Sequence, residues 1–208
     1  MKNIYIIGAQ STGKSTLVNA LEGCFEESGN GINTKRPLII REVARKVLKK
    51  YNFKREDIAT LPIRALQLQQ RILAAQYDAE TTACPAGAST WYICDRSGLD
   101  PIVYAKCLVG EHAAAEMLAS ESWRELEDRM KKSIVILCEA GCQWLKDDGV
   151  RLMPKDEVEW MRIDAAFRDL LRIRGIGFSV IPKDIANLEE RVGCSRMTSS
   201  SSGFVGDE

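Results

Sequence analysis

A segment near the start of the chain has the residue types and the spacing of a phosphate-binding loop. Residues 8–15 read GAQSTGKS, which fits the pattern GxxxxGKS/T, and they directly follow the apolar run Ile4–Ile7. The glycines allow the backbone to turn tightly with its N–H groups facing inward, and a following helix adds its positive N-terminal end. We expect Lys14 to reach the β- and γ-phosphates of ATP and the Ser15 hydroxyl to bind Mg²⁺. The predicted nucleotide-binding residues are Gly8, Gln10, Ser11, Thr12, Gly13, Lys14, Ser15 and Thr16.

An acidic residue stands at the end of another apolar run. Asp95 follows Trp91–Cys94 and is expected at the carboxyl edge of a parallel sheet, where a nucleotide held by residues 8–15 would lie. Its predicted role is that of a Walker-B-type carboxylate, which holds Mg²⁺ directly or through water. The alternative is a strand-end acid that pairs with Arg96 or caps the next helix.

A second acidic candidate follows the run Leu38–Ile40. Glu42 is expected at the same edge of the sheet, where it would accept the proton of an attacking hydroxyl or position the substrate. The alternative is a solvated acid at a helix start, flanked by arginines. The sequence does not choose between Glu42 and Asp95 as the base, because both are expected at strand ends.

A polar segment after the fourth apolar run has the character of a lid. Residues 144–154 read WLKDDGVRLMP and follow a short glycine-containing turn. In this reading Arg151 closes over the phosphates and stabilises the charge that develops during transfer. The alternative is a surface loop that carries a Lys-Asp-Asp charge cluster.

Short apolar segments alternate along the chain with longer stretches of helical period. This alternation predicts a three-layer α/β/α fold, in which a mostly parallel sheet has helices on both faces and binds ligands at the carboxyl ends of its strands. Ser122 and Asp156 are candidate helix caps, because each is followed three residues later by a glutamate. The expected strands are Ile4–Ile7, Leu38–Ile40, Trp91–Cys94, Ile134–Cys138 and Phe178–Ile181.

Length and composition limit the possible classes of protein. The 208 residues suit one domain, which we place at residues 1–194, followed by a serine-rich tail at 195–208 that is expected to be disordered. Lys plus Arg equals Asp plus Glu at 29 each, so no global positive field favours nucleic acid as a partner. No apolar run approaches the roughly 18 residues that span a bilayer, and no secretory signal is present. We therefore expect a cytoplasmic protein without a transmembrane segment.

The cysteine and histidine content argues against several kinds of site. The seven cysteines form no CxxC pair, and their odd number is atypical of a disulfide framework. We expect reduced thiols that serve mainly as small apolar side chains. His112 is the only histidine, which excludes multi-histidine metal sites.

Four segments together resemble the NadR-like AAA-type P-loop family, which includes the nicotinamide riboside kinase domain of the bacterial NAD regulator. They are GAQSTGKST, REVAR, DRSGLDPIVYA and WLKDDGVR, and the resemblance runs from about Lys2 to Val192. It implies a P-loop kinase-like fold with a central five-stranded parallel sheet. The segment at residues 138–144, CEAGCQW, departs from the Asp-x-Pro-Trp expected before the lid, which leaves the substrate open. The resemblance assigns Lys14 and Ser15 to nucleotide and metal, Glu42 and Arg45 to an ExAR element, Asp95 and Arg96 to a DR element, and Arg151 to the lid arginine.

The leading hypothesis is an ATP-dependent phosphotransferase that acts with Mg²⁺ on a small hydroxyl-bearing metabolite, with a nucleoside-like molecule as the favoured class. Glu42, Arg45 and Arg96 are the predicted substrate-binding residues, and Lys14, Glu42, Asp95 and Arg151 are the predicted catalytic ones.

Two other functions fit the same motifs. One is an NTP-hydrolysing or nucleotide-binding switch that engages a protein or phosphoinositide partner, and the other is an inactive nucleotide-binding scaffold. Lys35, Arg36, Lys49 and Lys50 are candidates for a phosphoinositide patch, for which ordinary solvated charge is the alternative. A Ras-like GTPase is disfavoured, because no Asn-Lys-x-Asp segment is present.

Overall fold

The centre of the molecule is a five-stranded parallel sheet. The structure is a computed structural model that describes residues 1–27, 36–85, 90–142 and 156–200. The strand order is β2-β3-β1-β4-β5, and every neighbouring pair is parallel. This confirms the predicted α/β/α class, and all five strands lie within one residue of their predicted positions. The strands are β1 (Ile4–Ile7), β2 (Leu38–Ile40), β3 (Tyr92–Asp95), β4 (Ile134–Cys138) and β5 (Ser179–Ile181).

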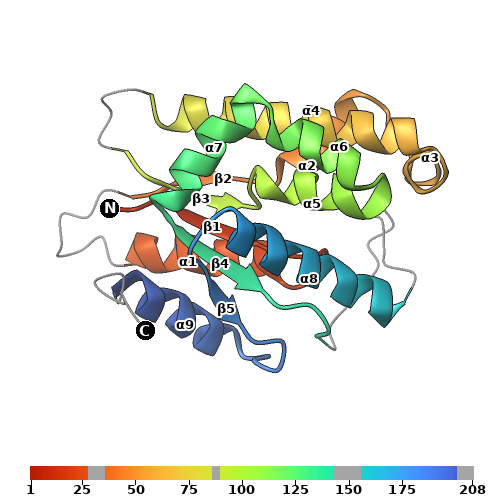
Figure 1. The fold of residues 1–208 in the computed structure, drawn as a ribbon. Coiled ribbons are helices and arrows are strands. Elements are labelled where there is room, and N and C mark those ends of the chain that lie inside the picture. The colour runs from red at the N-terminus through yellow and green to blue at the C-terminus, as the bar shows by residue number, and fades with distance from the viewer. Residues whose placement is uncertain (28–35, 86–89, 143–155, 201–208) are drawn as a thin grey trace.

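Helices cover both faces of the sheet. Helices α1 (Lys14–Glu27) and α9 (Leu188–Ser200) lie together on one face, and most of the other helices lie on the opposite face (Figure 1). The opposite face is covered by α4 (Pro62–Ala83), α5 (Leu99–Leu108), α7 (Glu121–Lys131) and α8 (Glu157–Ile173). The remaining helices are α2 (Val43–Lys50), α3 (Arg55–Thr60) and α6 (Glu111–Leu118).

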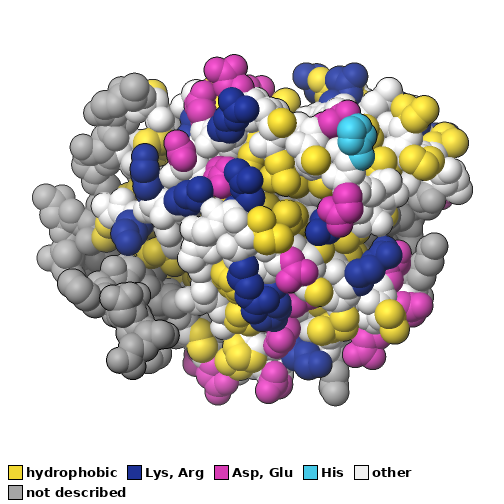
Figure 2. Space-filling model, in the orientation of Figure 1, with side chains coloured by type: hydrophobic (Ala, Val, Ile, Leu, Met, Phe, Trp, Pro, Cys, Tyr) yellow, Lys and Arg dark blue, Asp and Glu magenta, His cyan; other side chains and the backbone are white. Residues whose placement is uncertain are grey.

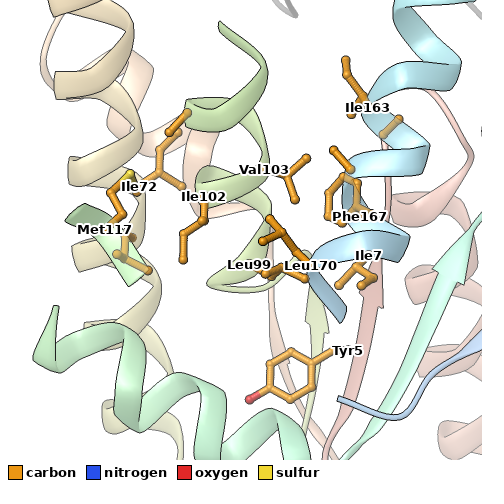
Figure 3. Close-up of a cluster of buried hydrophobic side chains, with 14 of the residues drawn as sticks. Tyr5, Ile7, Ile72, Leu99, Ile102, Val103, Met117, Ile163, Phe167 and Leu170 are labelled. Carbon is orange, nitrogen blue, oxygen red and sulfur yellow. The ribbon is translucent and has the colours of Figure 1, made fainter. Parts of the chain in front are cut away.

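The two-sided burial follows from the alternation of side chains along each strand. In β1, Tyr5 and Ile7 belong to the larger apolar cluster, whereas Ile4 and Ile6 belong to the smaller cluster beneath α1 and α9. A strand that is buried on both faces reads as a continuous apolar run, as β1 does. Figure 3 shows the larger cluster, in which side chains of α5 lie between those of α4, α6 and α8. Helix α5 is therefore held firmly at the centre of this layer.

The helix ends agree only in part with the caps predicted from the sequence. Asp156 caps α8 as predicted, because its carboxylate accepts from the Glu159 N–H at 2.8 Å. The prediction for Ser122 is wrong: α7 is capped by Ser120, whose hydroxyl accepts from the Trp123 N–H at 3.3 Å. Both serines precede the same apolar positions, so the sequence pattern does not separate them.

Helix α9 extends past the domain boundary expected at residue 194. It continues to Ser200, and Ser195 is buried with its hydroxyl donating to the Arg191 carbonyl at 2.9 Å. The remaining residues of the expected tail, 201–208, lie outside the described part of the chain.

The visible surface carries charges of both signs. Figure 2 shows acidic and basic side chains interspersed over the visible face. None of the seven cysteines, all of which lie in the described residues, forms a disulfide. Within the described residues, the model contains no helix that is both long and apolar enough to cross a membrane.

A pair of glycine substitutions tests the first turn after β1. Gly8 has φ +128°, and a Cβ atom there would lie 2.5 Å from the Cys138 carbonyl oxygen. Gly8→Ala is expected to lower the free energy of unfolding by about 2 kcal/mol or more, because the backbone must move against a central strand. Gly23→Ala in α1 is the control: apart from its chain neighbours and the backbone of its own helix, no atom lies within 4 Å of its Cβ position. It is expected to raise stability by about 0.5–1 kcal/mol. Urea denaturation measures the free energy of unfolding of both variants. A Gly8→Ala variant as stable as the parent would contradict the close approach of Gly8 to the Cys138 carbonyl.

Candidate active site

Residues 8–15, here called the phosphate loop, connect β1 to α1 at the carboxyl edge of the sheet. Three of these residues have positive φ angles: Gly8 at 128°, Ser11 at 59° and Gly13 at 79°. Left-handed conformations of this kind turn the chain so that successive N–H groups face a common centre. Ser11 is not a glycine, so its conformation requires support from the surrounding structure.

That support comes from helices that are distant in the sequence. The Gln10 N–H donates to the Tyr104 hydroxyl at 3.0 Å, and this hydroxyl donates to Gln10 Oε1 at 2.5 Å. The Gln10 carbonyl accepts from Trp160 Nε1 at 3.0 Å, and the Thr12 carbonyl accepts from Arg191 Nη2 at 2.9 Å. Helices α5, α8 and α9 therefore fix the peptide groups of the phosphate loop.

Lys14 lies inside the loop rather than in solvent. It is 4% exposed, and its ammonium group donates to the Ala9 carbonyl and, at 3.3 Å, to Thr12 Oγ1. Burial, followed by the repulsion of Arg96, lowers the pKa of Lys14 to about 8. A bound phosphate would supply the negative charge that favours the protonated form.

Ser15 and Asp95 meet at the position expected for a metal ion. The Ser15 hydroxyl donates to Asp95 Oδ2 at 2.5 Å. The other carboxylate oxygen, Oδ1, is buried and has no hydrogen-bond partner within the described residues. Within those residues no group of three or more His, Cys, Asp or Glu side chains could hold a metal by itself.

Arg96 bridges two acids next to the phosphate loop. Its Nε donates to Glu42 Oε1 at 2.9 Å, and its Nη1 donates to Asp100 Oδ1 at 3.4 Å. Burial opposes the charge of Arg96, but the two carboxylates raise its pKa. Burial also raises the pKa of Asp100, against the opposing effect of Arg96. Glu42 accepts a second bond from Arg45 Nε at 3.0 Å, so both of its oxygens are oriented.

An apolar pocket opens beside this ion-paired group. Its walls come from α2, α3, α4 and α5, and Gln10 of the phosphate loop also lines it. Apolar side chains predominate, and Glu42 and Arg96 lie among its few charged residues. This pocket is called the apolar pocket below. Its apolar residues are Val43, Ala44, Leu48, Ile58, Leu68, Ile72, Pro101 and Leu108.

A second hollow borders another part of the phosphate loop. Gly13, Thr16, Ala186, Leu188 and Arg191 line it. Gln10 contributes to the apolar pocket and Gly13 to this hollow, so the phosphate loop borders both.

The structure brings most of the predicted site residues together. Lys14, Ser15 and Asp95 form one group, and Glu42, Arg45 and Arg96 form the neighbouring group. Thr16 is exposed on the first turn of α1. Two predicted residues, Lys35 and Arg151, lie outside the described part of the chain, and Arg36 is exposed shortly before β2. Lys49 and Lys50 are exposed in the last turn of α2.

Several residues of the site were not predicted. Asp100 and Tyr104 lie within the segment DRSGLDPIVYA, so the family resemblance pointed to their neighbourhood without assigning them a role. Neither Trp160 nor Arg191 was predicted to belong to the site. Trp160 and Arg191 donate to backbone carbonyls, and no sequence pattern indicates such contacts.

Comparisons with known proteins agree with this geometry. A family model described as an AAA domain matches residues 3–191. The fold is similar to that of deoxyadenosine kinase from M. mycoides with bound dATP, with a TM-score of 0.64, 14% identity, and coverage of 97% of this chain and 100% of that one. It is also similar to NadR in complex with NR, with a TM-score of 0.64, 20% identity, and coverage of 100% of this chain and 53% of that one.

A second NadR structure, in complex with NAD and AMP-PNP, has a TM-score of 0.60, 17% identity, and coverage of 100% of this chain and 51% of that one. The chain thus spans about half the length of NadR. No curated protein matches the sequence. At these identities the solved structures establish the fold, whereas the family model covers nearly the whole chain. The chain therefore belongs to this AAA domain family, and its fold is that of the NadR-like P-loop proteins.

Proposed function

We propose that the protein transfers the γ-phosphoryl group of ATP to a hydroxyl group of a small, nucleoside-like acceptor. The observation that carries this proposal is the apolar pocket beside the phosphate loop, with the Glu42 carboxylate among its lining residues. A protein that only hydrolysed nucleotides would need no apolar pocket at this position, since its acceptor is water. The kinase neighbours described above, one of them with bound dATP, lend support to the same class of reaction.

The donor side of the site is formed by the phosphate loop. Its inward N–H groups and Lys14 would bind the β- and γ-phosphates, and Ser15 and Asp95 would hold Mg²⁺. When bound, Mg²⁺ supplies positive charge against the phosphate oxygens. The hydrogen bonds to Gln10 and Thr12 hold the loop in one conformation before the nucleotide binds. Little reorganisation is therefore needed during transfer.

On the acceptor side, Glu42 is better placed than Asp95 to orient the hydroxyl. Asp95 already accepts from Ser15 at the metal position, whereas Glu42 lines the apolar pocket. Arg45 and Arg96 each hold one oxygen of Glu42, which fixes the direction of the carboxylate. Glu42 would receive the hydroxyl proton as the new P–O bond forms.

The charges of the apolar pocket favour an acceptor without a phosphate group. Among the described residues that line it, Arg96 is the only basic one, and it already bridges Glu42 and Asp100. A nucleoside monophosphate would therefore place its phosphate next to two carboxylates. Apolar walls and two amide side chains, Gln69 and Gln76, suit a flat ring that carries a few polar groups.

An acceptor panel tests the proposed reaction. The full chain is incubated with γ-labelled ATP, Mg²⁺ and separate nucleosides, including nicotinamide riboside, and both free phosphate and phosphorylated nucleoside are measured. We expect at least one nucleoside to become phosphorylated, and the corresponding monophosphate to be a poor acceptor. Release of phosphate at the same rate with and without every acceptor, and without a phosphorylated product, would instead identify a hydrolysing switch.

The role of Glu42 is tested by Glu42→Gln, which keeps the size of the side chain but removes its capacity to accept a proton. We expect kcat to fall roughly 100-fold or more, while the KM for ATP changes little. Glu116→Gln, at an exposed position of α6, is the matched control and is expected to retain full activity. An unchanged kcat for Glu42→Gln would remove the assignment.

The metal role of Asp95 is tested by titrating Mg²⁺ against Asp95→Asn. The concentration of Mg²⁺ that gives half-maximal activity is expected to rise roughly 10- to 100-fold, because one anionic oxygen ligand or water-holder is lost. Asp128→Asn, exposed on α7, serves as control. Parent-like dependence on Mg²⁺ in Asp95→Asn would place the metal elsewhere.

A further inference from the structure

We infer that Gln76, held in one orientation by Glu80, selects acceptors that carry an N–H donor on the ring edge facing α4. The inference rests on the proposed function only in taking the apolar pocket as the acceptor site. It assigns a chemical preference to that pocket and a positioning role to a residue beneath it.

The amide of Gln76 is only half satisfied. Gln76 lines the apolar pocket and has no exposed surface, at 0%. Its Nε2 donates to Glu80 Oε1 at 2.8 Å and lies 3.5 Å from Cys94 Sγ. Its Oε1 is buried and has no hydrogen-bond partner within the described residues. Buried acceptors of this kind are rare and costly, and a ligand with an N–H group would satisfy this one.

Glu80 determines which end of the amide is available. Its Oε2 accepts from the Tyr5 hydroxyl at 2.7 Å and from the Tyr92 hydroxyl at 3.0 Å, and Arg129 Nη1 lies 4.0 Å away. Burial raises the pKa of Glu80, while the donors on both of its oxygens and the nearby Arg129 favour the charged form. Because Glu80 Oε1 accepts from Gln76 Nε2, rotating the Gln76 amide would set its oxygen against that carboxylate oxygen. The end of the Gln76 amide that is left for a ligand is therefore its acceptor oxygen and not its N–H group.

The ligand chemistry follows from this constraint. A flat ring between the apolar walls would direct an exocyclic amino group, a ring N–H or a carboxamide toward Gln76. Gln69, which is 5% exposed, lies two helical turns before Gln76 and adds another amide to the pocket wall. An acceptor that lacks the N–H donor would leave Gln76 Oε1 unsatisfied and would bind roughly 5- to 150-fold more weakly.

Glu80 acts through Gln76 and not on the acceptor. It is absent from the residues that line the apolar pocket, and its described partners are Tyr5, Gln76, Tyr92 and Arg129. It is thus a positioning residue for acceptor choice, set one helical turn from the side chain that it orients.

Matched pairs of nucleosides test the preference. Each pair differs in its N–H donor: adenosine and purine riboside, cytidine and its analogue without the exocyclic amino group, and nicotinamide riboside and the riboside with a methyl ketone in place of the carboxamide. Binding by calorimetry and kcat/KM with ATP and Mg²⁺ are both measured on the full chain. We expect the donor-bearing member of the best-fitting pair to be favoured roughly 10-fold or more.

The two measurements separate the inference from the proposed function. Selective binding without phosphorylation would keep the inference and overturn the kinase. Phosphorylation with equal kcat/KM and equal affinity within every pair would keep the kinase and overturn the inference. A complete lack of nucleoside binding would overturn the inference as well.

Variants then test the two residues separately. Gln76→Met, similar in size but without the amide oxygen, is expected to reduce the ratio within the favoured pair to about 1 by weakening only the donor-bearing member. Glu80→Gln frees the amide to rotate and is expected to narrow the same ratio. A purely structural role would weaken both members alike and leave the ratio unchanged, which would overturn the assignment. Gln70→Met, at an exposed position of α4, is the control. If a core variant fails to fold, the nucleoside pairs measured on the parent chain still test the inference.

Discussion

The phosphate loop keeps its shape because side chains from three distant helices bind its peptide groups. Tyr104, Trp160 and Arg191 reach it from α5, α8 and α9, and each uses a hydrogen bond of 3.0 Å or less. These bonds support the loop around Ser11, whose left-handed conformation is costly for a residue other than glycine. The central position of β1 in the sheet makes this possible, because elements on both faces lie within reach of the loop.

A buried arginine joins the two halves of the site. Arg96 links Glu42, which follows β2, to Asp100 in α5, and it stands next to Asp95 at the end of β3. A buried charge is tolerated when it is paired on both sides, and losing one partner typically costs about 3–5 kcal/mol. Arg96 also has a left-handed backbone, with φ 84°. This conformation is costly for a residue other than glycine and persists only where the surrounding structure stabilises it.

The fold and the phosphate loop could be predicted from the sequence, because short local patterns of residues specify both. Strands such as Ile134–Cys138 are short β-branched runs between polar residues, and Lys14 and Ser15 are marked by their spacing from Gly8. The bond between Glu42 and Arg96 joins residues 54 positions apart, so it depends on how β2 and β3 pair. The unsatisfied oxygen of Gln76 depends on packing alone, since an isolated glutamine on a helix face gives no sign of which atom lacks a partner.

The contact between Arg191 and the Thr12 carbonyl also bears on how the protein is made. The loop is synthesised long before the guanidinium that supports it, which belongs to α9. During translation, the early β1–α1 unit would leave the ribosome without this support. The loop would thus gain this support only after nearly the whole domain has emerged.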